Sequence, residues 1–409
     1  MNRIFIDDCA HWLEETDYPL DNGYDLVYID PPYDTGTKFS YLDKRVDWVP
    51  WMTGLMRQTK RHMRDDGILF ISIDDNRLIE LCSLCDEVFD KRNRLAIMIT
   101  HQSKRSNARH INIVHEYVVA YARNKAKLPP LSVPRMLTKD ASVIRSLKTE
   151  VARTFKDDGQ DSAQRLLRQR ISRHVGNGTT WLANYRFVDA NGRIYYAQDL
   201  SVPGEPNEVD ISEIGLHLNP LPTRKWSSPQ KFRQLHDAGL LEFLNGRPYE
   251  KHYLDDAEDS LSSLLPFYSR QGTEELKRLG CGGLFDTPKP PAMIELFILA
   301  VASGREQTRI LDFFGGSGTT AQATWQAQDK LGAGHRLSFD LVQIDEPMRE
   351  GTLPYRKATE LGIEPRIPNA LLRRLEAFCQ QEGEHGYSVI RVAEENPCPE
   401  ADSEAGETE

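Results

Sequence analysis

A turn with an unusual set of side chains, Asp30-Pro31-Pro32-Tyr33, follows the apolar run Leu26–Ile29. The run indicates a buried strand, and the two prolines end it because proline donates no N–H and fixes φ. Asp30 and Tyr33 are therefore held at the end of a strand, where α/β enzymes keep their reactive groups. A carboxylate there can accept hydrogen bonds from a substrate, and a tyrosine ring offers a face for stacking. Taken alone, Asp-Pro-Pro is more typical of an ordinary strand-terminating turn.

A second candidate site is a glycine-rich turn between an apolar strand at 309–313 and a predicted helix. Glycines let the backbone approach a ligand closely with positive φ, and hydroxyls and open N–H groups at the helix start can bind it. The turn lacks the lysine of a phosphate-binding loop and the G-x-G-x-x-G spacing of dinucleotide folds. By itself it indicates either a ligand loop or a plain tight turn. The residues of this candidate cofactor loop are Asp312, Phe314, Gly315, Gly316, Ser317, Gly318, Thr319 and Thr320.

The elements around both turns alternate between strand and helix, which predicts an α/β fold. Before residue 128 we expect strands at 4–6, 25–29, 67–73, 95–100 and 117–121, with helices at 46–63 and 76–89. After residue 290 we expect helices at 293–302, 319–328 and 369–380, with strands at 309–313 and 337–344. This alternation predicts a doubly wound, mostly parallel sheet covered on both faces. The ends of its two central strands share one crevice, so the two turns can meet there.

The α/β pattern breaks at Leu128-Pro129-Pro130, and a polar, irregular stretch with short β pieces follows. We therefore expect four parts: one half of the α/β domain at 1–127, an inserted module at 128–283, the other half at 284–380, and an acidic tail at 381–409. Between Arg145 and Arg173 the insert holds eight lysines and arginines against four acids. Such a charge run is usually a solvated face, but beside a candidate active site it also favours a polyanionic partner.

The composition is that of a globular protein, with 39% hydrophobic and 27% charged residues over 409 positions and a net charge of −10. No apolar run is long enough to cross a bilayer, so we expect no membrane segment. Six scattered cysteines favour a reducing cytoplasm over a disulfide framework. Cys82 and Cys85 lie in a helical pattern without a second pair at ligand spacing, so we expect no metal site.

Together, Asp-Pro-Pro-Tyr after one strand and Asp-x-Phe-x-Gly-Ser-Gly-Thr-Thr after another resemble the amino-methylating DNA methyltransferases that use S-adenosylmethionine. The order, with Asp30 far before Gly315 and an insert between, is similar to the β group of that family. The stretches "DGILFISIDDNRLIELCSLCDEVF", "HEYVVAYARNK" and "LFDTPKPPAMIELFILAV" are similar to the modification subunits of type III restriction systems. The resemblance covers residues 1 to about 378. It implies a Rossmann-like fold with permuted motif order and an inserted target-recognition domain.

The resemblance also implies roles for residues outside the two turns. Lys289 and Pro290, before the cofactor strand, are expected to border the methionine part of S-adenosylmethionine. Asp8, at the end of the first strand, is expected near its adenine, although a helix N-cap is the alternative for this residue.

One further cofactor contact departs from the family pattern. Family members carry an acidic residue at the end of the strand after the glycine loop, where it binds the ribose hydroxyls. Here that place holds Gln343, with Asp345 and Glu346 just beyond. A second departure is Asp34, where the family commonly has asparagine.

The chemistry of amino methylation fits the first turn. An exocyclic amine is a poor nucleophile because its lone pair is delocalised into the base. Asp30 and the Pro31 carbonyl can accept its two N–H groups and stabilise the charge that develops during in-line attack on the sulfonium methyl. Tyr33 can stack on a base that has been flipped out of the duplex, because the amine cannot reach the cofactor inside it. Neither a metal nor a covalent enzyme intermediate is needed.

Several substrates remain open from the sequence. Asp30 favours adenine N6 over cytosine N4, because cytosine-modifying relatives more often begin this motif with serine. The same residue disfavours a protein-glutamine methyltransferase, whose motif begins with asparagine. An RNA adenine methyltransferase uses the same chemistry, and only the insert favours DNA. A catalytically silent DNA-binding subunit is disfavoured by the intact motifs.

The expected partner is double-stranded DNA. We expect base readout by the insert and phosphate contact by Lys104, Arg105 and Arg109, which lie in a basic segment between two strands; solvation of a surface loop is the alternative. The family implies a homodimer and a restriction subunit with helicase and nuclease functions. The chain lacks the long C-terminal region common in type III modification subunits, so a solitary or phage-borne methyltransferase is an alternative.

Overall fold

The computed structural model describes residues 1–16, 23–33, 47–102 and 110–391. They form two compact units: residues 133–259 make one, and the rest of the described chain makes the other. The second of these, which we call the sheet domain, contains both turns singled out in the sequence. Among the described residues, no helix is both long and apolar enough to cross a membrane.

The sheet domain is built on a nine-stranded sheet within the described ranges, in the order β16-β4-β5-β3-β2-β17-β18-β1-β19. Among these strands only β5 runs antiparallel to its neighbours, which are β3 and β4. The strands are β1 (Arg3–Ile6), β2 (Tyr24–Ile29), β3 (Met63–Ile73), β4 (Arg94–His101), β5 (His115–Ala122), β16 (Leu264–Tyr268), β17 (Gln307–Asp312), β18 (Arg336–Gln343) and β19 (Ser388–Arg391). The doubly wound, mostly parallel α/β sheet expected from the sequence is therefore confirmed.

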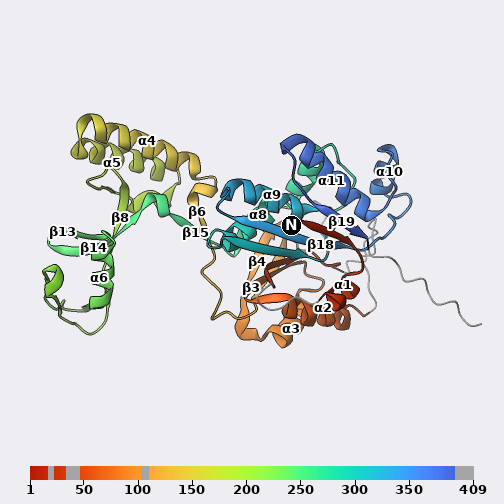
Figure 1. The fold of residues 1–409 in the computed structure, drawn as a ribbon, viewed down its shortest axis with the longest axis horizontal. Coiled ribbons are helices and arrows are strands. Elements are labelled where there is room, and N and C mark those ends of the chain that lie inside the picture. Colours follow the sequence, from red (N-terminus) through yellow and green to blue (C-terminus); the bar gives the residue numbers. More distant parts are fainter. Residues whose placement is uncertain (17–22, 34–46, 103–109, 392–409) are drawn as a thin grey trace, which may run out of the picture. The chain divides into compact units, whose positions relative to one another are not determined.

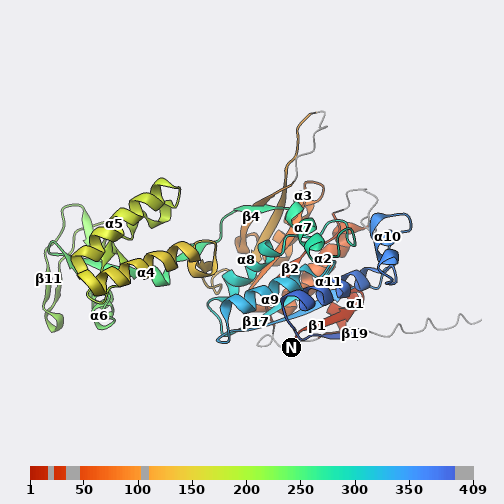
Figure 2. The same cartoon turned by 90° about the horizontal axis from the view of Figure 1, so that it is seen from above.

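Helices cover both faces of this sheet. Figures 1 and 2 show α1, α2 and α3 on one face, and α8, α9 and α11 on the other. The first face buries a core that includes Trp12, Trp48 and Phe89. The helices of the domain are α1 (Cys9–Glu15), α2 (Trp48–His62), α3 (Leu78–Phe89), α7 (Arg270–Arg278), α8 (Pro291–Ala302), α9 (Thr319–Leu331), α10 (Leu353–Glu360) and α11 (Ile367–Glu382).

The strands β2 and β17 are neighbours at the centre of the sheet, with Leu26 opposite Ile310 and Val27 opposite Leu311. Every residue of β2 is buried, as its unbroken apolar run predicts. From β2 the chain winds outward to β3, and from β17 it winds the other way to β18. The boundary between β2 and β17 is therefore the topological switch point, where open α/β sheets bind their ligands beyond the carboxyl ends of the strands.

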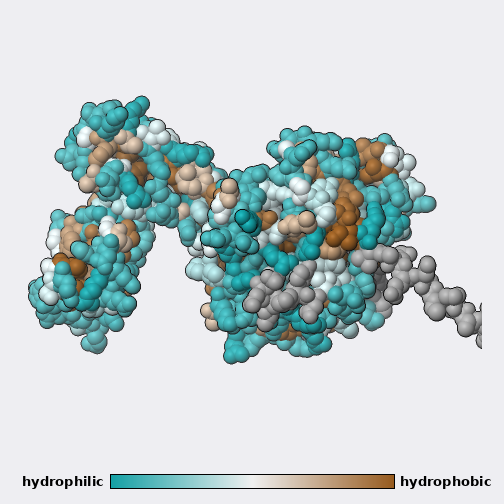
Figure 3. All heavy atoms as spheres, in the orientation of Figure 1, coloured by the Kyte–Doolittle hydropathy of each residue, from teal (hydrophilic) through white to brown (hydrophobic). Residues whose placement is uncertain are grey.

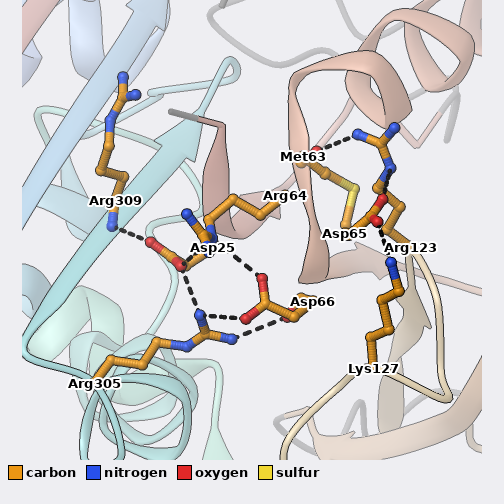
Figure 4. Close-up of polar contacts among 9 residues, drawn as sticks. All are labelled: Asp25, Met63, Arg64, Asp65, Asp66, Arg123, Lys127, Arg305 and Arg309. Atoms are coloured by element: carbon orange, nitrogen blue, oxygen red, sulfur yellow. Dashed lines mark hydrogen bonds and ion pairs between the residues drawn. The ribbon is translucent and has the colours of Figure 1, made fainter. Parts of the chain in front are cut away.

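Charged residues join the two halves of the domain at the amino ends of these strands (Figure 4). Asp25, at the start of β2, is 5% exposed, and burial raises the pKa of its carboxyl group. Arg305 Nη1 lies 2.8 Å from carboxylate oxygens of both Asp25 and Asp66. Arg64 Nε lies 3.2 Å from Asp25 Oδ1, and the Arg309 N–H donates to Asp25 Oδ2 at 2.8 Å. This cluster ties Arg305 and Arg309, from the last third of the chain, to the first.

The other unit, residues 133–259, begins with two long helices that the sequence does not lead us to expect. They are α4 (Ala141–Asp158) and α5 (Gln160–Gly176), which bury Ile144, Leu147 and Val151 against Ala163 and Leu167. The remaining elements are α6 (Pro229–Asp237) and the short strands β7 (Phe187–Val188), β8 (Ile194–Asp199), β9 (Ser201–Pro203), β10 (Val209–Ile211), β11 (Leu216–Leu218), β12 (Arg224–Trp226), β13 (Leu241–Leu244) and β14 (Arg247–Tyr253). Figure 3 shows mostly hydrophilic residues over α4 and α5, with some hydrophobic residues among them.

Two expected boundaries differ from the structure. The compact unit is narrower than the insert at 128–283, because β16 pairs with β4 in the sheet and α7 follows it. The chain passes between the units through β6 (Ser132–Pro134) and β15 (Glu258–Ser260), which form a two-stranded sheet. The acidic tail at 381–409 also starts too early, since β19 pairs with β1 in parallel.

Candidate active site

A cavity of about 560 Å³ lies at the carboxyl ends of β2 and β17. Both turns singled out in the sequence line it, together with residues that follow β3 and β18. The predicted site residues that line the cavity are Asp30, Pro31, Pro32, Tyr33, Lys289, Asp312, Phe314, Gly315, Gly316, Ser317, Thr319, Thr320 and Gln343. The fold therefore brings the acidic turn and the glycine turn to one pocket, as the doubly wound topology predicts.

The acidic turn is held by hydrogen bonds at both ends. The Tyr33 hydroxyl donates to Asp30 Oδ1 at 2.6 Å, and Trp48 Nε1 donates to the Pro32 carbonyl at 2.8 Å. Burial raises the pKa of Asp30, although Lys289 and the Tyr33 hydroxyl act against that rise. The turn thus presents a partly buried carboxylate, to which a hydrogen bond from a substrate is stronger than in water.

Lys289 connects the acidic turn to a second carboxylate that the sequence does not single out. Its Nζ donates to the Tyr33 hydroxyl at 2.6 Å and to Glu116 Oε2 at 2.8 Å, and lies 3.3 Å from Asp30 Oδ1. Burial by itself would lower the pKa of Lys289, but the carboxylates of Asp30 and Glu116 outweigh it and raise that pKa. The Gln102 side-chain amide donates in turn to Glu116. Glu116 belongs to the stretch "HEYVVAYARNK", which is one of those that resemble the family. The resemblance predicts the strand at this place but gives no indication that Glu116 contacts Lys289.

The glycine turn is fixed by its own strand and by the next one. Asp312, at the end of β17, accepts hydrogen bonds from the Phe314 N–H at 3.0 Å and the Thr320 hydroxyl at 2.5 Å. Burial raises the pKa of Asp312 to about 7. Gly316 has a φ of +52°, in the left-handed region that favours glycine, and its N–H donates to Gln343 Oε1 at 2.7 Å. These hydrogen bonds hold the backbone of the glycine turn in a conformation that lines the cavity.

The residues after β18 divide between shaping the loop and lining the cavity. Gln343 holds Gly316 and donates from its amide nitrogen to the Ile344 carbonyl. Asp345 pairs with Arg366, whose Nε lies 2.6 Å from its Oδ1. Of the two acids beyond Gln343, only Glu346 lines the cavity.

Three of the predicted cofactor residues do not line the cavity. Asp8 caps α1 by accepting from the Ala10 N–H at 2.8 Å, which is the alternative role considered for it. Pro290 is the residue before α8, and Gly318, with φ +77°, is the residue before α9. Both therefore shape the backbone beside the pocket. Lys104, Arg105, Arg109 and Asp34 lie outside the described residues.

Neither metal ligands nor the cysteines add to this site. No group of three or more histidine, cysteine, aspartate or glutamate side chains within the described ranges is arranged to hold a metal ion. Cys82 and Cys85 lie on α3, and burial raises the pKa of both thiols.

The fold and the cavity define a doubly wound α/β protein whose acidic turn and glycine turn meet at the switch point. Over residues 24–331, most of its length, the chain matches the family described as DNA methylase, with N6 and N4 members, and it belongs to this family.

Named relatives agree with this assignment. The chain is 27% identical over 369 residues to the Mod subunit of the type III restriction-modification enzyme EcoP15I from Escherichia coli, covering 80% of this chain and 55% of that protein. It is 25% identical over 384 residues to the type II methyltransferase M.KpnI from Klebsiella pneumoniae, covering 88% of this chain and 86% of that protein. The chain thus spans about half the length of the type III relative. The resemblance to modification subunits that the motifs suggest is confirmed.

Solved structures include a Thermus thermophilus protein described as a DNA modification methylase, complexed with S-adenosyl-L-methionine. It is 13% identical to this chain with a TM-score of 0.42, over 96% of this chain and 99% of that one.

Proposed function

We propose that this protein transfers the methyl group of S-adenosylmethionine to the N6 amine of adenine in duplex DNA, with the base flipped out of the helix. One observation carries the proposal: the Asp30 turn and the Gly315 turn line the same cavity at the switch point. The first offers acceptors for an amine, and the second offers a backbone that a ligand can approach closely.

The residues present fit S-adenosylmethionine. Ser317 and Thr319 bring hydroxyls to the cavity, Glu346 brings a carboxylate suited to ribose hydroxyls, and Phe314 brings an aromatic wall. When bound, the cofactor supplies an electrophilic methyl group on a sulfonium. We assign the ribose contact to Glu346, because it is the acid beyond Gln343 that lines the cavity.

The chain's own chemistry lies in the acidic turn. Asp30 accepts one N–H of the target amine, and the Pro31 carbonyl accepts the other, which localises the lone pair on nitrogen. Positive charge then develops on the amine next to a partly buried carboxylate, which stabilises it. Tyr33 provides a face on which the flipped base stacks. For Asp30 Oδ1 to accept the amine, the hydrogen bond from the Tyr33 hydroxyl must yield or be shared.

Adenine is favoured over cytosine by the head of the motif, which is Asp30 rather than serine. The matched family has both N6 and N4 members, so cytosine N4 is the second candidate.

We assign base readout to the insert, which the sequence places at 128–283. Its compact unit in the structure is residues 133–259. Support comes from exposed cations on its two helices: Arg145, Lys148, Arg153 and Lys156 on α4, and Arg165, Arg168 and Arg173 on α5. Replacing the insert by that of a relative should change the methylated sequence and leave the reaction intact. Neutralising Lys104, Arg105 or Arg109 should instead weaken all sequences alike and lower the salt slope by about one per lost phosphate contact.

A homodimer and a restriction subunit are the protein partners we propose. Support for the restriction subunit comes from the relatives named as Mod subunits of restriction-modification enzymes. A methyltransferase that acts without a restriction partner is the second candidate, favoured by the similarity to the type II enzyme M.KpnI, of which the chain covers 86%.

The proposal is tested by incubating the protein with methyl-labelled S-adenosylmethionine and either mixed-sequence duplex DNA or structured RNA. We expect label in the duplex only, and N6-methyladenine in the digested product by mass spectrometry. Label in RNA alone, or N4-methylcytosine alone, would overturn the substrate assignment. Absence of transfer to any substrate, from protein that binds S-adenosylhomocysteine, would favour a silent subunit.

A further inference from the structure

Arg374 is a fully buried arginine, with 0% of its surface exposed, on α11 behind the glycine turn. It does not line the cavity, and nothing in the sequence motifs marks it. Burial lowers the pKa of Arg374 to about 10, so its guanidinium still carries a positive charge at neutral pH. A buried charge is costly unless its hydrogen bonds are satisfied, so the contacts of this side chain define its role.

The guanidinium is bound by neutral groups of the glycine turn and of α9. Its Nη1 donates to the Ser317 hydroxyl oxygen at 2.7 Å and to the Thr319 hydroxyl oxygen at 2.6 Å. Its Nε and Nη2 donate to Gln322 Oε1 at 3.0 and 2.9 Å. The Gln322 amide nitrogen then donates to Glu275 at 2.6 Å. The carboxylate of Glu275 is therefore linked to the Arg374 guanidinium only through the side chain of Gln322.

These contacts fix the direction of the hydroxyl hydrogen bonds, because a guanidinium can donate but cannot accept. The Ser317 and Thr319 oxygens are therefore acceptors toward Arg374, and each keeps one proton to donate. The two oxygens lie 3.1 Å apart, so one of the two protons serves their mutual hydrogen bond. No acceptor in the described part of the chain takes the other. Both residues are at least 94% buried and both line the cavity, so the remaining proton can be donated to a group bound in the cavity.

Two further features favour an anionic group at this place. Ser317 and Thr319 stand at the start of α9, whose first N–H groups lack partners within the helix and whose dipole attracts negative charge. The positive charge of Arg374 lies directly behind the two hydroxyls. Of the functional groups of S-adenosylmethionine, only the carboxylate of the methionine part is an anion.

We propose that Arg374 is a positioning residue, which holds Ser317 and Thr319 as donors and so creates a subsite for the carboxylate of the methyl donor. The inference rests on the proposed function, since it concerns the same cofactor. Arg374 acts through the two hydroxyls and does not touch the cofactor itself.

The test compares two ligands that differ in the amino-acid end, which carries that carboxylate. S-adenosylhomocysteine contains the amino-acid end, whereas 5′-methylthioadenosine lacks it. Calorimetry with the full chain is expected to show that Arg374→Met weakens S-adenosylhomocysteine binding by roughly tenfold or more and leaves methylthioadenosine binding within about twofold. Arg374→Lys, which keeps the charge with fewer donors, should recover part of the loss. Arg373→Met is the matched control, because Arg373 lies on the same helix and is 33% exposed, with Glu376 3.6 Å away.

An equal loss for both ligands would overturn the inference, since it would indicate a general structural role. No loss for either would do the same. Should Arg374→Met not fold, the double variant Ser317→Ala, Thr319→Val must show the same selective loss, and an unselective one would refute the subsite. Failure of the unaltered protein to bind S-adenosylhomocysteine would overturn the proposed function and this inference together, whereas binding with an unselective loss would overturn the inference alone.

Discussion

Lys289 and Tyr33, 256 positions apart in the sequence, are joined by a hydrogen bond of 2.6 Å from the ammonium to the phenol oxygen. The Tyr33 hydroxyl in turn donates a hydrogen bond to Asp30 Oδ1. The same carboxylate oxygen lies 3.3 Å from the Lys289 ammonium. A target amine that approaches Oδ1 must compete with these two donors, so the strength of the Lys289 contacts bears directly on the reaction.

Asp30→Ala should lower methyl transfer by at least about a hundredfold, because the amine loses its charged acceptor. Binding of S-adenosylhomocysteine should stay within about threefold, since the glycine turn is untouched. Transfer is measured with labelled cofactor and affinity by calorimetry. The control is Asp75→Ala, an exposed carboxylate that follows β3 and accepts from Tyr117 at 3.0 Å. Near-normal turnover by folded Asp30→Ala protein would contradict the mechanism.

Glu116→Gln should lower kcat by roughly tenfold with little change in cofactor affinity. Without the second carboxylate, the Lys289 ammonium is left to Asp30 and Tyr33 alone, and it holds the acceptor more tightly against the incoming amine. A double-mutant cycle separates this from a general packing effect. In a Lys289→Met background the Glu116→Gln change should cost almost nothing further. Additive losses in the cycle would mean that Glu116 acts independently of Lys289.

Gly316→Val should weaken S-adenosylhomocysteine binding by more than about tenfold, because a branched side chain disfavours the φ of +52° and narrows the backbone's approach to the ligand. The matched control is Gly332→Val at the end of α9, where φ is +77° and an added Cβ meets nothing within 4 Å. Both variants carry backbone strain, but only the first should lose affinity in calorimetry. Equal affinities for the two variants would remove the loop from the binding site.

Asp312 should make stability depend on pH, because its pKa is about 7 in the folded protein against an ordinary value of 3.8. Between these values the folded state holds a proton that the unfolded state has lost. The free energy of unfolding contributed by this group is therefore greatest at low pH and falls by up to about 1.4 kcal/mol per pH unit until pH passes about 7. Urea unfolding from about pH 5 to about pH 8 should show Asp312→Asn gaining stability relative to the unaltered protein as pH rises. A constant difference would show that Asp312 keeps an ordinary pKa.

Local pattern was enough to predict most of the sheet domain. β2 was expected at 25–29 and is found at Tyr24–Ile29, and α8 was expected at 293–302 and is found at Pro291–Ala302. The missed elements depend on distant partners or on narrow apolar stripes. β16 and β19 are short edge strands that exist through pairing with β4 and β1. In α4, Ile144, Leu147 and Val151 keep helical spacing, but the polar residues around them conceal it.

The meeting of the two turns in one candidate site was also predictable from the sequence. Asp30 and Gly315 follow strands directly, so each turn could be read from its own surroundings, and the switch-point rule placed them together. Glu116 and Arg374 could not be found in this way, because each acts through a residue more than 50 positions distant. For Asp8, the family resemblance predicted a contact with the cofactor, and the local sequence also allowed a helix cap. In the structure its carboxylate accepts hydrogen bonds from the N–H groups of Ala10 and His11 at the start of α1.

The pairing of β2 with β17 also sets an order of events during synthesis. Asp25 accepts a hydrogen bond from the N–H of Arg309, which is synthesised 284 positions later. At ribosomal rates of about 5–20 residues per second, the time between the synthesis of these two residues is roughly 15 to 60 seconds. Throughout that time β2 has one open edge, and Asp25 lacks Arg305, its partner from the later half. Residues 133–259, which contain their own buried clusters, are complete well before. The unit at 133–259 can thus fold before β17, β18 and β19 of the nine-stranded sheet have been synthesised. During this time the open edge of β2 is a site at which the nascent chain could aggregate.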